Sequence, residues 1–391
     1  MDKSDLFWDV ASIDYPILDA DAHVNEPPEL WQSRVPAKWK ARAPKVRHTD
    51  HGDVWDFDDG ARLRPVGLTA TAGLSYPQFK PVGGSYATMR PGSFDTKERL
   101  HDMDVDGIFA QILYPSVTLT GASIYASEPE LQRVCVRAYN EWLGEFCEGS
   151  GGRLVPLAIV PTTGTKDAVA ELEWAMANGH RGVVISAFPN GSHDSQEEDA
   201  AFWEAAQDLR APVSVHIGSF IPSTQGGGQK QMSFTELAFL GKAGAAKAGG
   251  HTLPVVSDLL FAGVFDRFPD VACVLVEANI GWIPTLLEQT DDMFMRYRFF
   301  TEADRKMKML PSEIFRRSFW ASFMIDTVGL ELRHRMNIDH IMYSTDYPHT
   351  GCDWPNSRQQ IERLFRGIPK TEVRKMLHDN CKALYRLDHI A

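Results

Sequence analysis

The sequence predicts an α/β fold, a closed (β/α)8 TIM barrel, and three observations favour this fold. Eight short apolar runs rich in β-forming residues alternate with amphipathic helical patterns, and strands separated by helices pair in parallel through right-handed crossovers. No internal repeat or linker divides the chain, so residues 1–391 are expected to form a single domain. Polar side chains of metal-binding types follow several of the runs, at the strand ends where such a barrel carries its active site.

The expected elements follow in order along the chain. The strands are expected within Pro16–Pro27 and at 107–114, 154–160, 182–187, 212–217, 271–277, 319–322 and 340–346. The helices are expected at 95–104, 128–148, 166–178, 197–209, 234–247, 254–265, 283–298, 327–336, 356–366 and 372–385.

Two segments interrupt the alternation. Residues 28–94 are rich in Pro, Gly and Trp and are too long for an ordinary loop, so they are expected to form an inserted arm after strand 1. Residues 219–252 contain a glycine-rich run and then a Gly/Ala/Lys-rich helical pattern. This second segment is expected to form a lid after strand 5.

Composition excludes several classes of protein. The formal net charge is −12 and no basic run is present, which argues against nucleic-acid binding. The acidic N-terminus lacks the apolar stretch of a signal peptide or membrane span, so a cytoplasmic protein is expected. Five scattered cysteines without a Cys-x-x-Cys pair fit reduced thiols rather than a disulfide framework or a cysteine zinc site.

The first strand carries the strongest chemical signal. Asp19, Asp21 and His23 stand at two-residue spacing and share one face of the strand. Burying an ionised group costs several kcal/mol, on the order of 3 or more, unless it is paired or binds a cation, so this face predicts part of a metal site. The alternative is a strand end whose polar residues face solvent or cap the next helix.

Further candidate ligands come from distant parts of the chain. Each emerges at or just beyond the end of an expected strand: Glu26, His216, Glu277, Asp346 and His349. Each also has a plain structural reading, as a core histidine, a helix cap or a loop residue. Their coincidence at the same end of several strands favours a shared metal centre.

These motifs resemble those of the amidohydrolase superfamily, in the amidohydrolase-related branch that includes the carboxymuconate-semialdehyde decarboxylases. The likeness rests on Asp-x-His in strand 1, His after strand 5 and Ser-Thr-Asp-Tyr-Pro after strand 8, and it runs from Pro16 to Leu387. It implies metal-ligand roles for Asp21, His23, His216 and Asp346. The chain departs from the branch in two ways, with Asp21 in place of a first-strand histidine and Glu277 where the decarboxylases keep a catalytic histidine.

The number of carboxylates leads to the main functional hypothesis. Four of them (Asp21, Glu26, Glu277 and Asp346) balance two divalent cations, and oxygen-rich sets with imidazole suit iron or manganese. Some members of the branch use two irons on coenzyme-A-linked substrates, and this chain resembles them. The hypothesis is a non-haem diiron monooxygenase of secondary metabolism, which hydroxylates a bulky apolar acyl substrate, CoA-linked, with O2 and an electron-donating reductase or ferredoxin.

The hypothesis assigns a role to each candidate residue. His23, His216 and His349 supply nitrogen ligands, and the four carboxylates supply oxygen ligands; Asp346, Glu277 and His216 are also the expected catalytic residues. Asp19 is expected to orient a ligand histidine. The cations expected to hold CoA phosphates are Lys242, Lys247, Arg296 and Arg298.

Two alternatives stay open. The first is a mononuclear Zn or Mn hydrolase or non-oxidative decarboxylase, with Asp346 as general base. The second is a barrel that has lost its metal and serves as a binding or scaffold protein. For the enzyme hypotheses the expected substrate is a small molecule. Separately, a homodimer is expected to be able to form through the arm at 28–94.

Overall fold

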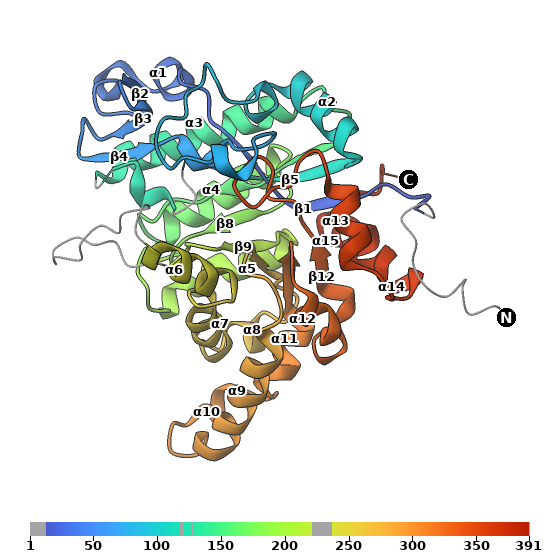
Figure 1. The fold of residues 1–391 in the computed structure, drawn as a ribbon. Coiled ribbons are helices and arrows are strands. Elements are labelled where there is room, and N and C mark those ends of the chain that lie inside the picture. Colours follow the sequence, from blue (N-terminus) through green and yellow to red (C-terminus); the bar gives the residue numbers. More distant parts are fainter. Residues whose placement is uncertain (1–12, 118–120, 127, 221–236, 391) are drawn as a thin grey trace.

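The protein is a parallel (β/α)8 barrel, which confirms the predicted TIM-barrel fold (Figure 1). The computed structural model describes residues 13–117, 121–126, 128–220 and 237–390. The barrel strands are β1 (Leu18–Val24), β5 (Ala110–Pro115), β6 (Leu154–Pro156) with β7 (Ala158–Ile159), β8 (Val183–Ile185), β9 (Val213–His216), β10 (Cys273–Val276), β11 (Phe319–Phe323) and β12 (Ile341–Tyr343).

Every neighbouring pair in the barrel is parallel. β6 and β7 are separated by Leu157 alone and act as one strand, in which β6 pairs with β5 and β7 pairs with β8. The barrel closes between its first and last strands. The backbone N–H of Asp346 donates to the carbonyl of Asp21 at 2.9 Å, and the N–H of His23 donates to the carbonyl of Tyr347 at 2.6 Å.

Helices surround the barrel, and apolar side chains fill the space between them and the strands. The helices are α1 (Leu30–Arg34), α2 (Thr96–Asp106), α3 (Pro129–Cys147), α4 (Thr165–Ala177), α5 (Ala200–Asp208), α6 (Leu237–Lys247), α7 (Thr252–Phe261), α8 (Val264–Arg267), α9 (Ile283–Tyr297), α10 (Ala303–Lys306), α11 (Pro311–Ser318), α12 (Thr327–Glu331), α13 (Ser357–Leu364), α14 (Lys370–Arg374) and α15 (Asn380–Tyr385).

Residues 28–94, predicted only as an inserted arm, contain a three-stranded antiparallel sheet. Its strands are β2 (Lys45–Thr49), β3 (Gly52–Phe57) and β4 (Arg62–Pro65). The indole N–H of Trp31 donates to the carbonyl of Cys135 on α3 at 3.0 Å, which ties the segment to the barrel's outer layer. The N–H groups of Thr71 and Ala72 both donate to the carbonyl of Pro348, so the segment also reaches the loop after β12.

The segment expected to form a lid is described only in part. Residues 221–236 lie outside the described residues, and the rest forms α6 and the start of α7. In Figure 1, α6 lies beside the barrel near β9, whereas the far end of α9 and α10 project away from it. None of the helices in the described part of the chain combines the length and apolarity of a membrane span.

Candidate metal centre

The candidate ligands gather at the carboxyl ends of four barrel strands. Asp21 and His23 lie on β1, His216 is the last residue of β9, Glu277 directly follows β10, and Asp346 lies three residues after β12. All five side chains are buried. Apolar runs place the strands in the interior, so a polar residue at the end of each run is carried into the mouth of the barrel.

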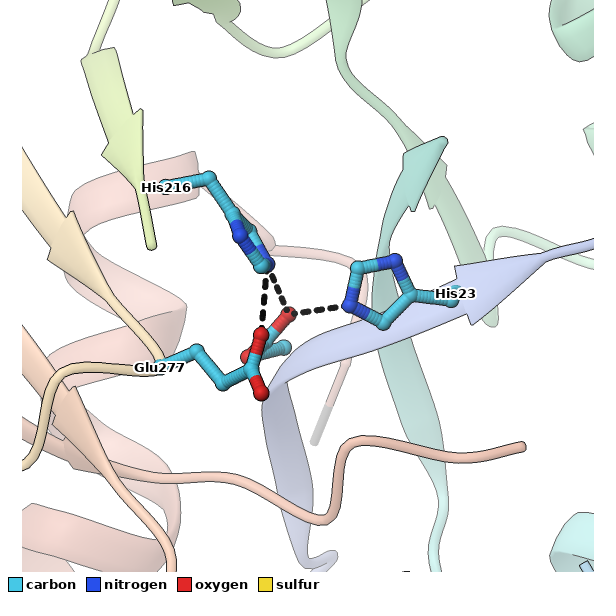
Figure 2. Close-up of side chains that lie close together, drawn as sticks. His23, His216 and Glu277 are labelled. Carbon is cyan, nitrogen blue, oxygen red and sulfur yellow. Dashed lines mark ion pairs between the residues drawn. The ribbon is translucent and has the colours of Figure 1, made fainter. Parts of the chain in front are cut away.

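One ligand atom from each of Asp21, His23, His216 and Glu277 lies within 4.8 Å of the others. Figure 2 shows His23, His216 and Glu277 pointing toward one another. The Nε2 atom of His23 lies 3.4 Å from Oδ1 of Asp21 and 3.4 Å from Oδ1 of Asp346. The Nε2 atom of His216 lies 3.4 Å from Oδ1 of Asp21 and 3.6 Å from Oε2 of Glu277. Asp21, His23, His216 and Glu277 therefore share one small volume, and Asp346 adjoins it through His23.

Backbone carbonyls fix the orientation of both histidine rings. Nδ1 of His23 lies 2.9 Å from the carbonyl oxygen of Pro115, and Nδ1 of His216 lies 3.1 Å from that of Ile217. A nitrogen that donates to a carbonyl leaves the other ring nitrogen unprotonated and available as a ligand. In each ring, that other nitrogen is the Nε2 that faces the cluster.

The residues present fit a divalent metal ion. Several buried atoms in the cluster have no hydrogen-bond partner: Nε2 of His23 and of His216, both carboxylate oxygens of Asp21, and Oδ1 of Asp346. Buried polar atoms without partners are costly, and their convergence is the arrangement that a bound cation satisfies. Two histidines and three carboxylates form a donor set suited to Mn or Zn.

His349 extends the cluster on the side of Asp346. Its Nδ1 lies 3.3 Å from Oδ1 of Asp346, and its ring stacks on His23 with 3.8 Å between centroids. Its Nε2 lies 2.9 Å from the hydroxyl of Ser116, which is not among the residues predicted for the site. His23, Asp346 and His349 form a second group of closely spaced ligand atoms.

Lys247 brings a positive charge to the same place. The side chain reaches in from the end of α6 and forms an ion pair with Oε1 of Glu277, and its Nζ lies 3.9 Å from Oδ2 of Asp346. Burial lowers the pKa of Lys247, but Glu277 and Asp346 outweigh it, so the pKa stands above its ordinary value. The amine is therefore an ammonium group.

Burial is the largest cause of the pKa shifts of the titratable groups in the cluster. It raises the pKa of Asp346 to about 7, against the opposing charge of Lys247. It lowers the pKa of His349 to about 4 and holds that of His23 well below its ordinary value. In His216 burial lowers the pKa too, but Asp21 outweighs it and raises the pKa overall.

The backbone is left-handed at two of the ligand positions. Glu277 has φ of 64° and Asp346 has φ of 59°. Non-glycine residues adopt this conformation at a cost of about 1 kcal/mol or more, and it recurs at functional sites. Here the left-handed residue directly follows β10 at Glu277 and comes three residues after β12 at Asp346.

Asp19 does not orient a histidine, and the prediction of that role is wrong. Its carboxylate accepts from the N–H of Thr345 at 2.9 Å, the hydroxyl of Thr345 at 2.5 Å and the amide of Gln111 at 3.1 Å. Asp19 therefore positions the turn that carries Asp346. Gln111 could have been noticed as a lone amide within an apolar strand, and Gln111 in turn accepts from the buried Arg99 at 3.0 Å.

Glu26 lies apart from the converging ligand atoms. Both of its carboxylate oxygens accept from the backbone N–H of Val117, at 3.2 and 3.1 Å. Glu26 is absent from both groups of closely spaced ligand atoms found among the described residues. The carboxylates near the histidine ligand atoms are therefore Asp21 and Glu277 in one group and Asp346 in the other.

The cations expected to bind phosphate are dispersed. Lys242 is exposed on α6. Arg296 is exposed near the end of α9 and pairs with Asp292 at 2.8 Å, and Arg298 lies over the ring of Phe299. The structure brings only Lys247 of the four predicted cations to the metal ligands.

Charge balance in the centre favours one metal ion. With metal-bound carboxylates counted as anions and the histidines as neutral, Asp21, Glu277, Asp346 and the ammonium of Lys247 give a formal charge of −3 + 1 = −2. One divalent cation neutralises this charge, whereas two would leave an excess of two positive charges in a buried site. The reason for expecting two irons therefore no longer applies, because Glu26 is elsewhere and Lys247 is present.

Comparisons with known proteins identify related sequences and structures. A family model described as amidohydrolase matches residues 19–387. No curated protein matches significantly. Similar solved structures include an amidohydrolase from Mycobacterium avium subsp. paratuberculosis, with a TM-score of 0.74 and 18% identity over 96% of this chain and 100% of the other.

Two further similar structures are decarboxylases with bound manganese. One is a dihydroxybenzoic acid decarboxylase from Polaromonas (TM-score 0.62, 17% identity, 96% of this chain and 98% of the other). The other is a 5-carboxyvanillate decarboxylase from Novosphingobium aromaticivorans (TM-score 0.66, 16% identity, 98% and 99%). At these identities the likeness shows the fold.

The main functional hypothesis from the sequence is wrong. The similar structures are decarboxylases and amidohydrolases, which favours the alternative reading over an oxygen-activating diiron monooxygenase. Two irons likewise find no support, whereas one Zn or Mn is consistent with the ligand set. Because the family model spans nearly the whole chain, the protein belongs to the amidohydrolase family and is a metal-dependent enzyme of that superfamily.

Proposed function

We propose that this protein is a non-oxidative decarboxylase of a small organic acid and uses one divalent ion, Mn or Zn. The observation that carries the proposal is the convergence of unpartnered buried atoms from Asp21, His23, His216 and Asp346, in a site whose charge one divalent ion neutralises. The manganese-bound decarboxylases of similar fold support this choice, since their named substrates are aromatic acids.

The reaction needs no oxidant or reductant. The bond between the substrate carbon and its carboxylate carbon breaks, carbon dioxide leaves, and the electron pair stays on the substrate carbon, which then takes a proton. A divalent ion, when bound by Asp21, His23, His216 and Asp346, supplies Lewis acidity toward a substrate oxygen. The protein's own groups must hold the acid, exclude water and deliver the proton.

Asp346 is the group that we assign to proton transfer. Its Oδ1 lies between Nε2 of His23 and Nδ1 of His349, at 3.4 and 3.3 Å, while its Oδ2 faces Lys247. One oxygen therefore belongs to the ligand cluster and the other is directed toward the lysine. Beyond this contact, Nε2 of His349 lies 2.9 Å from the hydroxyl of Ser116, so polar groups continue away from Asp346.

Hydrolysis is the second candidate, and Glu277 favours it. A carboxylate beside His216, rather than an imidazole, is a suitable acceptor for a proton of an attacking water. Like decarboxylation, hydrolysis uses one divalent ion and no molecular oxygen.

Anaerobic turnover tests the proposal. The protein is loaded with Mn or Zn and its metal content is measured. It is then incubated without oxygen with 2,6-dihydroxybenzoate, 5-carboxyvanillate and related acids in D2O. We expect release of carbon dioxide with one deuterium placed at the vacated carbon, and loss of both in Asp346→Asn.

Glu26→Gln serves as the matched carboxylate control and should keep activity, because Glu26 bonds the Val117 amide instead of joining the cluster. Release of an alcohol or amine from an ester or amide panel, without carbon dioxide, would support the hydrolase. Turnover that requires oxygen and a reductant would contradict both candidates.

A further inference from the structure

A cavity of about 330 Å³ opens beside the metal centre, between α6, the loop after β10 and the start of α12. The residues that line it include Gly244, Lys247, Ala248, Trp282, Asp326 and Val328. This volume is at the lower end of the range, about 300 to 1,000 Å³, that pockets for small molecules occupy.

Lys247 connects this cavity to the metal ligands. The same side chain lines the cavity, pairs with Glu277 and lies 3.9 Å from Oδ2 of Asp346. An ammonium group has three N–H donors, and Glu277 takes one of them. Asp346 is beyond hydrogen-bond distance, so the ammonium retains donors for a ligand in the cavity.

The acidic side chain in the cavity wall is already engaged. Asp326 accepts from the backbone N–H groups of Ile280, Gly281 and Gly329, each at 2.7 Å. These bonds hold the Asp326 carboxylate in place at the start of α12. Lys247 is thus the charged group in the wall that has hydrogen-bonding capacity left for an anion.

Trp282 gives the cavity a fixed flat wall. Its indole N–H donates to the carbonyl of Ala278 at 2.8 Å. Its ring lies against Gly249, where an added Cβ would come within 2.5 Å of the ring atoms. A ring held at its N–H and on one face is a preformed surface for an apolar or aromatic ligand.

We propose that this cavity is the substrate pocket, in which Lys247 binds the carboxylate of an organic acid and Trp282 contacts an apolar body about the size of one aromatic ring. The inference rests on the proposed function for the reaction, but its binding chemistry stands on the cavity alone. It replaces the CoA-phosphate role predicted for Lys247, because the ammonium lies at the metal ligands, within the mouth of the barrel.

Binding of matched acids and amides tests the role of Lys247. The probes are benzoate and 2,6-dihydroxybenzoate with their uncharged amides, titrated calorimetrically into the Mn-loaded enzyme. We expect the wild type to prefer the acids, and Lys247→Met to weaken acid binding about 10- to 100-fold while leaving amide binding nearly unchanged. Lys247→Arg should restore part of the preference, and Lys242→Met, an exposed lysine on the same helix, should retain all of it.

A pair of glycine variants tests the cavity without touching Lys247. A Cβ at either Gly244 or Gly241 meets no atom within 4 Å, so a side chain can be added at both positions without a clash at its Cβ. Gly244 lines the cavity and Gly241 is not among its lining residues. We expect Gly244→Leu to weaken binding of the acids at least about 10-fold, as a filled pocket does, and Gly241→Leu to change it less than about 2-fold.

The outcomes separate this inference from the proposed function. Three results would overturn the pocket assignment. The wild type binds none of the acids at millimolar concentration, or Lys247→Met binds the acids as tightly as the wild type. The third is that the two leucine variants weaken acid binding equally. Lysine-dependent binding of the acids without release of carbon dioxide from any substrate would leave the pocket intact and overturn only the decarboxylase. Metal content is measured for every variant, so that loss of the ion is not mistaken for loss of the pocket.

Discussion

The carboxylate of Asp19 accepts two hydrogen bonds from Thr345, one from its backbone N–H and one from its hydroxyl, at 2.9 and 2.5 Å. Thr345 directly precedes Asp346, so this contact between the first strand and the loop after the last strand positions a metal ligand. Interactions behind a ligand of this kind affect metal affinity although they never touch the metal.

Thr345→Val should weaken metal binding about 10-fold and lower the free energy of unfolding by about 1 to 2 kcal/mol. Valine keeps the shape but removes the hydroxyl, which leaves a buried lone pair of Asp19 unpaired. Chelator competition measures the affinity and urea unfolding measures the stability. Thr301→Val, at an exposed position, should change neither; equal effects of the two variants would refute the positioning role.

Metal should bind at one ion per chain and stabilise the fold. At a metal concentration a thousand times Kd, binding adds about 4 kcal/mol, which raises Tm by several degrees. Elemental analysis and thermal unfolding before and after chelation measure both quantities. Asp21→Asn should lose the ion and the Tm increase, whereas Glu26→Gln should keep both. Two ions per chain in the wild type would contradict the charge balance.

Gly351→Ala should displace Asp346. A Cβ at position 351 would lie 2.3 Å from Oδ2 of Asp346 and 2.7 Å from the terminal methyl of Met324, so the carboxylate has to move. We expect metal affinity to fall about 10-fold or more, as for other changes that disturb a ligand's orientation. Gly241→Ala, with open space around its Cβ, is the control. Unchanged affinity in Gly351→Ala would show that the carboxylate adjusts without loss.

Acid should destabilise the protein through His180. This side chain is 2% exposed, its ring nitrogens have no hydrogen-bond partner, and burial lowers its pKa from 6.5 to about 4. The unfolded chain takes up the proton first as the pH falls, so the contribution is complete above pH 6.5, shrinks below it and is lost once the pH passes the folded pKa.

Between pH 7.5 and 5 this single group should lower the free energy of unfolding by about 2 kcal/mol. Urea unfolding at the two pH values measures the loss, and His180→Gln should reduce it by that amount. His251→Gln, at an exposed position, should keep the full acid effect. An identical pH dependence in the wild type and His180→Gln would disprove the assignment.

The barrel was predictable from the sequence because its strands are short apolar runs bounded by turns. The ends of those runs also revealed His216, Glu277 and Asp346, since a polar residue that closes a buried strand has few places to lie. The antiparallel sheet at 45–65 was missed although its signals are present, with alternating residues around His51–Gly52 and Asp59–Gly60. Its short strands lay within a stretch read only as an insertion.

Other features depend on contacts that spacing along the chain does not encode. Glu26 is a residue type that commonly binds metals, but its carboxylate accepts hydrogen bonds from the backbone N–H of Val117 instead. Lys247 reaches the metal ligands because α6 ends beside the barrel mouth, which a helical pattern alone cannot reveal. The hydrogen-bond partner of Asp19 is set by the approach of Thr345, more than three hundred residues later.

The contact between the first strand and the segment after the last strand closes the barrel and also brings the metal ligands together. Asp21 accepts from the amide of Asp346 and His23 donates to the carbonyl of Tyr347, so the same residues join strand to strand and collect the ligands. During synthesis, the N-terminal ligands emerge from the ribosome long before the C-terminal ones exist. A complete cation site therefore requires the last strand to dock against the first, so loading of the ion depends on closure of the barrel.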